Sequence, residues 1–297
     1  MDNQLFVAGH TACAGCGQSL GARLVLEAAG PRTIIVNNTG CLEVFSTKYP
    51  ESAWSVPWIH SLFENAAAVA SGVEQALIYS GKKEGTNVIA QGGDGGTADI
   101  GLQALSGMWE RGHDILYVCY DNEAYMNTGI QRSGLTPFDT NTTTSPIGAK
   151  STGNIRPKKP MPEIAAAHGI PYVATATVGF AQDLQRKVKK ALGIKGPKYI
   201  QVHAPCPLGW RYETALTIQV GKLAVETGLY PMIEFEFGVL TVRKITPKPV
   251  EEYLKAQGRF KHLLGNQEEL KKIQAIADNN IAKYGLKIET TQQASVQ

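Results

Sequence analysis

Four of the five cysteines stand at positions where they could ligate a metal centre. Cys13 and Cys16 form a C-x-x-C loop at the start of a predicted helix, and Cys41 and Cys206 each directly follow a predicted strand. Because the loops after the strands of a doubly wound sheet meet at one edge, these two can lie beside the C-x-x-C loop. Cys119 lies inside an apolar strand and is predicted to be a small core residue.

Thiols in this pattern are compatible with three kinds of site: a redox-active dithiol, a zinc ion or an iron–sulfur cluster. A thioredoxin-like pair normally follows a strand, and no predicted strand precedes Cys13. A structural zinc ion prefers a second local C-x-x-C or a histidine pair, which this sequence does not provide. On spacing alone, buried or incidental thiols are an equal alternative.

A glycine-rich segment around Asp94 has the chemistry of a diphosphate site. Gly92 to Gly96 follows the apolar strand 87–90 and precedes a predicted helix, so that backbone amides can face an anion. The segment lacks the third glycine of G-x-G-x-x-G and the Lys-Ser/Thr of a P-loop. A carboxylate among phosphate-binding glycines requires a cation, and Mg²⁺, which prefers oxygen ligands, is suitable.

Asn122 lies 28 residues after Asp94 and follows the next predicted strand, 115–120. Adjacent parallel strands would place the two side chains beside each other at the carboxyl ends of the strands. An amide oxygen and a nearby backbone carbonyl, such as that of Ala124, would complete the protein's share of an octahedron. The alternative is a tight turn in which the aspartate caps a helix. The pairing with Asn122 favours the cofactor site.

The elements that must position these residues form an α/β pattern. Short apolar strands alternate with predicted helices from Ser19 to Val202, which predicts a doubly wound parallel sheet with helices on both faces. Amphipathic runs over 250–257 and 267–284 predict helices near the C-terminus, and residues 290–297 are expected to fray.

The sequence accordingly predicts two regions. We expect an α/β domain over residues 1–240 and a helical C-terminal extension over residues 241–297. Between the predicted elements, residues 133–159 are rich in Thr, Ser, Pro, Gly and Lys and predict a long loop, either functional or disordered.

Composition limits the classes of function. The 297 residues are 43% hydrophobic and 19% charged, as in an ordinary globular chain, and the net charge of +3 is too small to indicate nucleic acid. The odd number of cysteines and the absence of an export signal in the first ten residues argue against a secreted disulfide scaffold. No stretch predicts a membrane span, so we expect a soluble, cytoplasmic protein that binds neither membrane nor nucleic acid.

Together the motifs resemble those of a known family. GDGGTADIG followed by DN resembles the cofactor motif of thiamine diphosphate enzymes. With CAGCG, TGC, SLFENAAAVASG, DNEAYMNTGIQRSG and APCP, the chain is similar over residues 7–261 to β subunits of 2-oxoacid:ferredoxin oxidoreductases, above all those acting on pyruvate. The resemblance implies the thiamine-diphosphate-binding fold that holds the diphosphate end of the cofactor. It also implies reversible, coenzyme A-dependent oxidative decarboxylation of pyruvate to acetyl-CoA and CO₂, with electrons passing through a [4Fe-4S] cluster to ferredoxin.

The resemblance also implies roles for particular residues. Asp94, Asn122 and the Ala124 carbonyl match the Mg²⁺ ligands, and Asn127 matches an asparagine near the reactive carbon and is the candidate catalytic residue. Gln18 departs from the pattern, because some relatives carry a glutamate there. The cluster ligands implied are Cys13, Cys16, Cys41 and Cys206. The residues implied to bind the cofactor are Gln18, Cys41, Gly93, Asp94, Gly95, Gly96, Asn122, Glu123, Ala124, Tyr125 and Asn127.

The resemblance further implies a subunit of a larger enzyme. A second domain must supply the glutamate that contacts the aminopyrimidine, and this sequence has one glycine–acid motif and no two-cluster ferredoxin run. The expected partners are an α subunit with the pyrimidine-side domain, γ and ferredoxin-like δ subunits, and ferredoxin. The basic loop 133–159 is expected to cover the active site, to contact the phosphates of coenzyme A, or to be ordered by a partner subunit.

Several alternatives stay open. Oxalate or 2-oxoisovalerate could replace pyruvate, although the polar segment 140–144, if it borders the substrate, favours a small polar acid. From another class, the chain could be a non-catalytic electron-transfer subunit, but such a subunit needs no pair like Asp94 and Asn122. A non-redox thiamine decarboxylase or acetolactate-type enzyme is disfavoured by the four placed cysteines.

Overall fold

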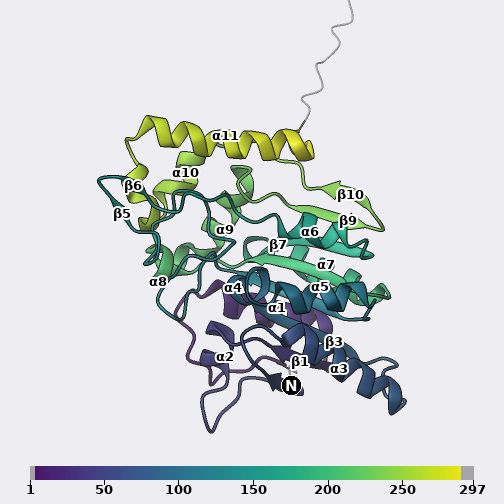
Figure 1. Ribbon diagram of the computed structural model, residues 1–297. Helices are drawn as coiled ribbons and strands as arrows, with labels where there is room; N and C mark the ends of the chain where they lie inside the picture. Colours follow the sequence, from purple (N-terminus) through teal and green to yellow (C-terminus); the bar gives the residue numbers. More distant parts are fainter. Residues whose placement is uncertain (1–3, 289–297) are drawn as a thin grey trace, which may run out of the picture.

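The computed structural model describes residues 4–288 and is built around one eight-stranded sheet (Figure 1). The strand order is β10-β9-β7-β8-β4-β3-β1-β2. All neighbours from β7 to β2 are parallel, whereas β9 pairs antiparallel with both β7 and β10. The predicted α/β fold with a parallel sheet is confirmed, and the antiparallel edge is an addition to it.

The bounds of the elements are as follows. The strands of the main sheet are β1 (Thr33–Asn37), β2 (Trp58–His60), β3 (Asn87–Gly93), β4 (Leu116–Asp121), β7 (Tyr172–Thr177), β8 (Lys198–His203), β9 (Ile233–Glu236) and β10 (Val239–Val242). The α-helices are α1 (Gly17–Ala29), α2 (Cys41–Ser46), α3 (Ala66–Tyr79), α4 (Asp94–Ala98), α5 (Leu102–Glu110), α6 (Met161–Ala167), α7 (Ala181–Gly193), α8 (Pro207–Trp210), α9 (Thr217–Glu226), α10 (Val250–Lys255) and α11 (Gln267–Tyr284). The 3₁₀ helices are η1 (Val178–Phe180), η2 (Thr214–Leu216) and η3 (Gly258–Leu263).

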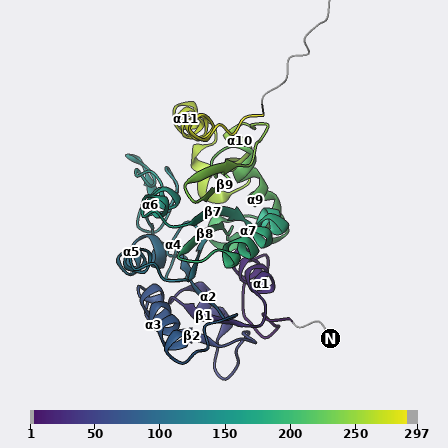
Figure 2. The same cartoon turned by 90° about the vertical axis from the view of Figure 1, so that its right-hand side faces the viewer.

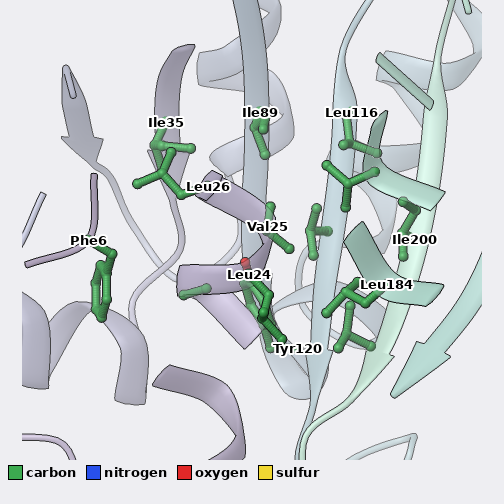
Figure 3. Packing of buried hydrophobic residues seen from close by; sticks show 14 of the residues in the cluster. Phe6, Leu24, Val25, Leu26, Ile35, Ile89, Leu116, Tyr120, Leu184 and Ile200 are labelled. Atoms are coloured by element: carbon green, nitrogen blue, oxygen red, sulfur yellow. The ribbon is translucent and has the colours of Figure 1, made fainter. Parts of the chain in front are cut away.

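Two apolar cores lie on opposite faces of the sheet, because successive residues of a strand point to opposite sides. Helices α1 and α7 cover one face and α3, α5 and α6 cover the other (Figure 2). In β4, Val118 and Tyr120 enter the first core, while Tyr117 and Cys119 enter the second. Cys119 is fully buried there, which confirms that it is a core residue. Figure 3 shows the first core, with Leu24, Val25, Leu26 and Leu184 of the helices beside Ile35, Ile89, Leu116 and Ile200 of the strands.

The C-terminal region packs on the main domain through a third core. Trp210 of α8 meets Tyr253 of α10 and Phe260 of η3, and Ile273 of α11 completes this core. The predicted helices over 250–257 and 267–284 correspond to α10 and α11. The expected boundary between residues 240 and 241 falls inside β10, so the extension continues from the sheet itself. Residues 290–297, which are expected to fray, lie outside the residues that the structure describes.

The segment 133–159 has a defined conformation instead of a featureless loop. It contains the two-stranded pair β5 (Ile147–Gly148) and β6 (Ser151–Thr152). Asn154 is buried, and its amide nitrogen donates to the carbonyls of Thr136 at 2.9 Å and Pro137 at 3.0 Å. Side-chain bonds to the backbone thus replace the missing regular structure. Within residues 4–288, no helix combines the length and apolar character needed to cross a membrane.

Candidate functional site

A cavity opens where β1, β3 and β4 end, at the carboxyl edge of the sheet. Ligands of open α/β sheets bind at this edge. The wall of the cavity includes every residue predicted to bind the cofactor except Glu123. It also includes residues that the sequence did not indicate. The lining residues are Gln18, Thr39, Gly40, Cys41, Phe63, Gly93, Asp94, Gly95, Gly96, Asn122, Ala124, Tyr125, Met126, Asn127 and Thr128.

Three oxygen-bearing groups converge in this cavity. In the register of β3 and β4, Gly93 pairs with Tyr120, which brings Asp94 and Asn122 together just beyond the strands. One end of the Asn122 amide lies 3.0 Å from Asp94 Oδ1 and 2.9 Å from the Ala124 carbonyl oxygen. If the NH₂ group of Asn122 occupies that end, it donates hydrogen bonds to both oxygens. If the amide oxygen occupies it, three oxygens face one another and can bind a cation together. Octahedral Mg²⁺ with bonds of about 2.0–2.1 Å sets neighbouring ligand oxygens about 2.9 Å apart, so these residues fit the ion.

Among residues 4–288, no Lys, Arg or His side chain forms an ion pair with the Asp94 carboxyl, and Lys158 acts on it only through the field of its charge. Asp94 is buried, and burial followed by repulsion from Asp121 raises its pKa well above the usual range. The Ser133 hydroxyl donates to Asp94 Oδ2, a contact that the sequence analysis missed because Ser133 belongs to the long loop. Lys158 lies outside the lining of the cavity, with its Nζ 2.7 Å from Asp121 Oδ2. A divalent cation in front of Asp94 would supply the charge that its ionised form needs.

Asn38 holds the glycine loop, residues Gly92–Gly96, in place through three hydrogen bonds. Its Nδ2 donates to the Gly96 carbonyl at 3.1 Å and to the Tyr117 hydroxyl at 3.0 Å, and its Oδ1 accepts from the Ala66 amide at 2.9 Å. A Cβ atom on Gly95 would lie 2.3 Å from the Tyr125 ring, so this glycine is needed for close packing. A Cβ on Gly93 would meet no atom within 4 Å, although Gly93 lines the cavity. Space for a ligand is therefore open beside Gly93.

The loops that carry the four predicted cluster ligands lie near one another: the Gly17 amide donates to the Pro205 carbonyl at 3.1 Å, and Cys41 lines the cavity. Burial, followed by repulsion from Cys206, Cys16, Asp94 and Cys13, raises the pKa of the Cys41 thiol, and burial raises the pKa of Cys206 to about 11. Cys16 Sγ accepts from the Ser19 amide at 3.5 Å, and Cys206 Sγ accepts from the Gly209 amide at 3.4 Å.

These backbone donors lie in the first turns of α1 and α8, where amides without a partner in the helix can stabilise a thiolate. In the part of the chain that the structure describes, no three His, Cys, Asp or Glu side chains are grouped as ligands of a single metal ion. A cubane cluster takes each thiolate on a different iron, so its ligands stand further apart than those of one ion.

Glu123 is placed differently from the expectation. Its φ is +66°, and its side chain turns away from the cofactor cavity to meet Lys158 at 2.7 Å and Arg259 at 2.5 Å. Burial acts to raise the pKa of Glu123, but the charges of Lys158 and Arg259 lower it to about 2. The side chain lines a second cavity of about 300 Å³, next to His203 and the C-terminal helices. The Glu123 carboxylate therefore belongs to a buried group of ion pairs outside the lining of the cofactor cavity.

Two of the basic residues in the loop 133–159 form ion pairs within the chain. Lys158 binds Asp121 and Glu123, while Lys159 binds Asp99 at 3.0 Å and the Ala98 carbonyl, so both amines are engaged within the chain. The segment 140–144 is absent from the lining of the cofactor cavity. Its Thr143 amide instead donates to the Ile130 carbonyl at 3.0 Å, which supports the neighbouring loop. That the segment 140–144 borders the substrate stays a prediction.

The fold and the site define a thiamine diphosphate-binding domain, and residues 38–202 match the family described as thiamine pyrophosphate enzyme, C-terminal TPP binding domain. The chain is 62% identical to pyruvate synthase subunit PorB of Methanosarcina barkeri, over 94% of this chain and 96% of that protein. It is 57% identical to pyruvate synthase subunit PorB of Methanocaldococcus jannaschii, over 95% and 97%. The chain belongs to the pyruvate synthase subunit PorB family, which confirms the resemblance inferred from its motifs.

A solved structure shares the fold. The 2-oxoglutarate:ferredoxin oxidoreductase from Magnetococcus marinus superposes with a TM-score of 0.60 at 20% sequence identity, covering 91% of this chain and 92% of that one. At this identity the likeness concerns the arrangement of the elements. It extends beyond residues 38–202, and so includes segments outside the matched cofactor domain.

Proposed function

We propose that the chain is the subunit of a 2-oxoacid:ferredoxin oxidoreductase that holds the diphosphate end of thiamine diphosphate. The complex would oxidatively decarboxylate pyruvate with coenzyme A to acetyl-CoA and CO₂, reversibly. The observation that carries the proposal is the convergence of Asp94, Asn122 and Ala124 in a cavity whose wall also includes Cys41. Membership of the PorB family supports pyruvate as the 2-oxo acid.

The residues around the cavity divide the work of binding. Asp94, Asn122 and the Ala124 carbonyl would hold Mg²⁺, and the backbone of Gly93 to Gly96 would face the diphosphate. Asn127, at the exposed rim of the cavity, would stand near the reacting carbon. The chemistry that the bound cofactor supplies is a carbon nucleophile and an electron sink for decarboxylation. The chain itself would orient the diphosphate and hold the cation that balances its charge.

The four converging cysteines would hold one [4Fe-4S] cluster. Cys41 begins α2 and also lines the cofactor cavity, so a cluster bound there would be adjacent to the cofactor. Electrons would leave the active site one at a time through this cluster and continue to ferredoxin through partner subunits. Backbone amides directed at Cys16 and Cys206 support the anionic thiolates that such a cluster requires.

We expect the Gly93→Ala variant to fold normally but to bind thiamine diphosphate at least about tenfold more weakly than the wild type. The added methyl group meets no protein atom within 4 Å, yet it enters the cavity beside Asp94. Gly72→Ala is the matched control, because its methyl group also meets nothing within 4 Å but lies on α3, outside the cavity lining. Calorimetric titration and thermal melting measure the two effects. Equal affinity in both variants would place the diphosphate elsewhere.

We expect the isolated chain, supplied with iron, sulfide, Mg²⁺ and thiamine diphosphate, to oxidise no pyruvate until its partner subunits are added. The pyrimidine-side carboxylate must come from another subunit. Exposed Leu62 lies next to Phe63 of the cavity wall, and exposed Leu208 lies two residues from Cys206, as on surfaces that a partner covers. The assay follows coenzyme A-dependent reduction of an artificial electron acceptor.

Turnover by the isolated chain at the rate of the complex would refute the half-site assignment. The complex is then assayed with pyruvate, 2-oxoisovalerate and oxalate at equal concentrations. Preference for either of the latter two would correct the substrate while leaving the cofactor site intact. If none of these three acids supports reduction of the acceptor, but another electron donor does, the chain would instead be a non-catalytic electron-transfer subunit.

A further inference from the structure

The turn that carries Asn122 and Ala124 is held by contacts from distant parts of the chain. Glu123, between them, has a φ of +66°, a conformation that a residue with a side chain adopts only when its surroundings enforce it. The Trp210 indole nitrogen donates to the Asn122 carbonyl at 2.9 Å, and the Thr136 hydroxyl donates to the Glu123 carbonyl at 2.7 Å. The backbone of the turn is thus fixed at two consecutive carbonyls.

Arg259 joins the groups that hold this turn. It comes from η3, 136 residues away from Glu123, and its Nη2 lies 2.5 Å from Glu123 Oε2. Its guanidinium carbon lies 3.6 Å from the centre of the Trp210 ring. Its Nε donates to Gln257 Oε1 at 2.9 Å, and only 3% of its side chain is exposed. One guanidinium therefore contacts both the carboxylate of the turn and the indole that binds the turn.

The same junction reaches the cysteines. Trp210 ends α8, the helix that Cys206 caps, and the Trp210 amide donates to the Cys206 carbonyl at 2.9 Å. A Cβ atom on Gly209 would lie 2.1 Å from the Met126 sulfur and 3.4 Å from Cys206 Sγ. Met126 in turn lines the cofactor cavity. The cavity wall, the turn and the Cys206 loop are therefore packed against one another.

We propose that Arg259 is a positioning residue that sets the geometry of the Mg²⁺–diphosphate site through Glu123 and Trp210. This inference rests on the proposed function, because it assumes that Asn122 and Ala124 bind the ion. Mg²⁺ demands near-ideal octahedral angles. A turn released from Arg259 would relax from its left-handed conformation, and the Ala124 carbonyl would move relative to Asp94. The C-terminal extension thus determines how well the main domain binds its cation.

The test compares two variants that each replace a buried cation by methionine in the anaerobically purified complex. Arg259→Met removes the guanidinium, and the control Lys198→Met removes an amine that is equally buried and lies 2.5 Å from Asp114, at the opposite end of β8 from the cavity. Two quantities are measured. The first is the Mg²⁺ concentration for half-maximal binding of thiamine diphosphate, which is detected by the circular dichroism of the bound cofactor. The second is the melting temperature. We expect Arg259→Met to need at least about tenfold more Mg²⁺. The control should melt at a lower temperature with an unchanged Mg²⁺ requirement.

A third variant keeps the inference testable if Arg259→Met does not fold. Trp210→Phe retains an aromatic ring beneath Arg259 but removes the donor to the Asn122 carbonyl. It should also raise the Mg²⁺ requirement. The inference is overturned if every folded variant of Arg259 and Trp210 requires the same Mg²⁺ concentration as the control. Absence of Mg²⁺-dependent cofactor binding in the wild type would instead refute the proposed function itself.

Discussion

Replacing Asp94 by asparagine is expected to abolish Mg²⁺-dependent binding of thiamine diphosphate while leaving the iron content unchanged. The amide keeps the shape of the side chain but removes the charge that balances the cation in a buried site. Because Asp94 would contact the ion directly, the affinity should fall by more than about 100-fold, beyond the usual effect of an outer-shell residue. Calorimetric titration of the purified complex, with cofactor content after gel filtration, measures the loss.

Asp114→Asn is the matched control for this experiment. Asp114 also lies in a charged cluster, with Lys198 at 2.5 Å and Lys83 at 3.1 Å, but it is absent from the cavity wall. The control variant should retain wild-type cofactor affinity even if it melts at a lower temperature. Undiminished thiamine diphosphate in Asp94→Asn would eliminate the Mg²⁺ site that we propose.

Replacing Cys206 by serine is expected to remove the iron–sulfur cluster, reducing iron from about four atoms per chain to nearly none. A serine hydroxyl is far less acidic than a thiol and is a much weaker ligand for iron than a thiolate. Cys13→Ser, Cys16→Ser and Cys41→Ser should have the same effect, because each cysteine would hold a different iron of one cubane. Iron and sulfide analysis of anaerobically purified variants, together with electron paramagnetic resonance after reduction, measures the loss.

Cys119→Ser provides the internal control, because the change of atom is identical but Cys119 is fully buried within β4. It should retain the full iron content even if its stability falls. Loss of the cluster in Cys119→Ser with retention in Cys206→Ser would reverse the ligand assignment. Loss in all five variants would indicate a general effect of substitution on folding.

The closeness of Asp94 and Asn122 could be predicted from local signals in the sequence. Strand-like runs before Asp94 and Asn122, together with the rule that ligands bind at the carboxyl edge of a parallel sheet, were sufficient to bring these two residues together. The predicted elements of the main domain follow from the same regular alternation of apolar segments.

The parts that were missed depend on long-range pairing of charges. Glu123 and Arg259 are 136 residues apart, and a charged residue far from any motif is ordinarily assigned to the solvated surface. Lys158 was assigned to a basic loop, because composition indicates a loop but not the direction in which its side chains point. The antiparallel strands β9 and β10 did leave a signal. Ile233 to Glu236 alternates apolar and acidic residues, and Phe237-Gly238 forms the turn with positive φ at both residues.

The hydrogen bonds by which Asn38 holds the glycine loop have a thermodynamic consequence. The three hydrogen bonds are made entirely with groups of the chain itself, and they tie the loop to β4 and α3. The loss of backbone entropy, on the order of 1–2 kcal/mol per residue, therefore occurs during folding and not during ligand association. A ligand that meets an already rigid loop keeps more of its contact energy as affinity. The capture of the diphosphate should accordingly be governed by charge and desolvation, with little signature of coupled folding in the heat capacity of binding.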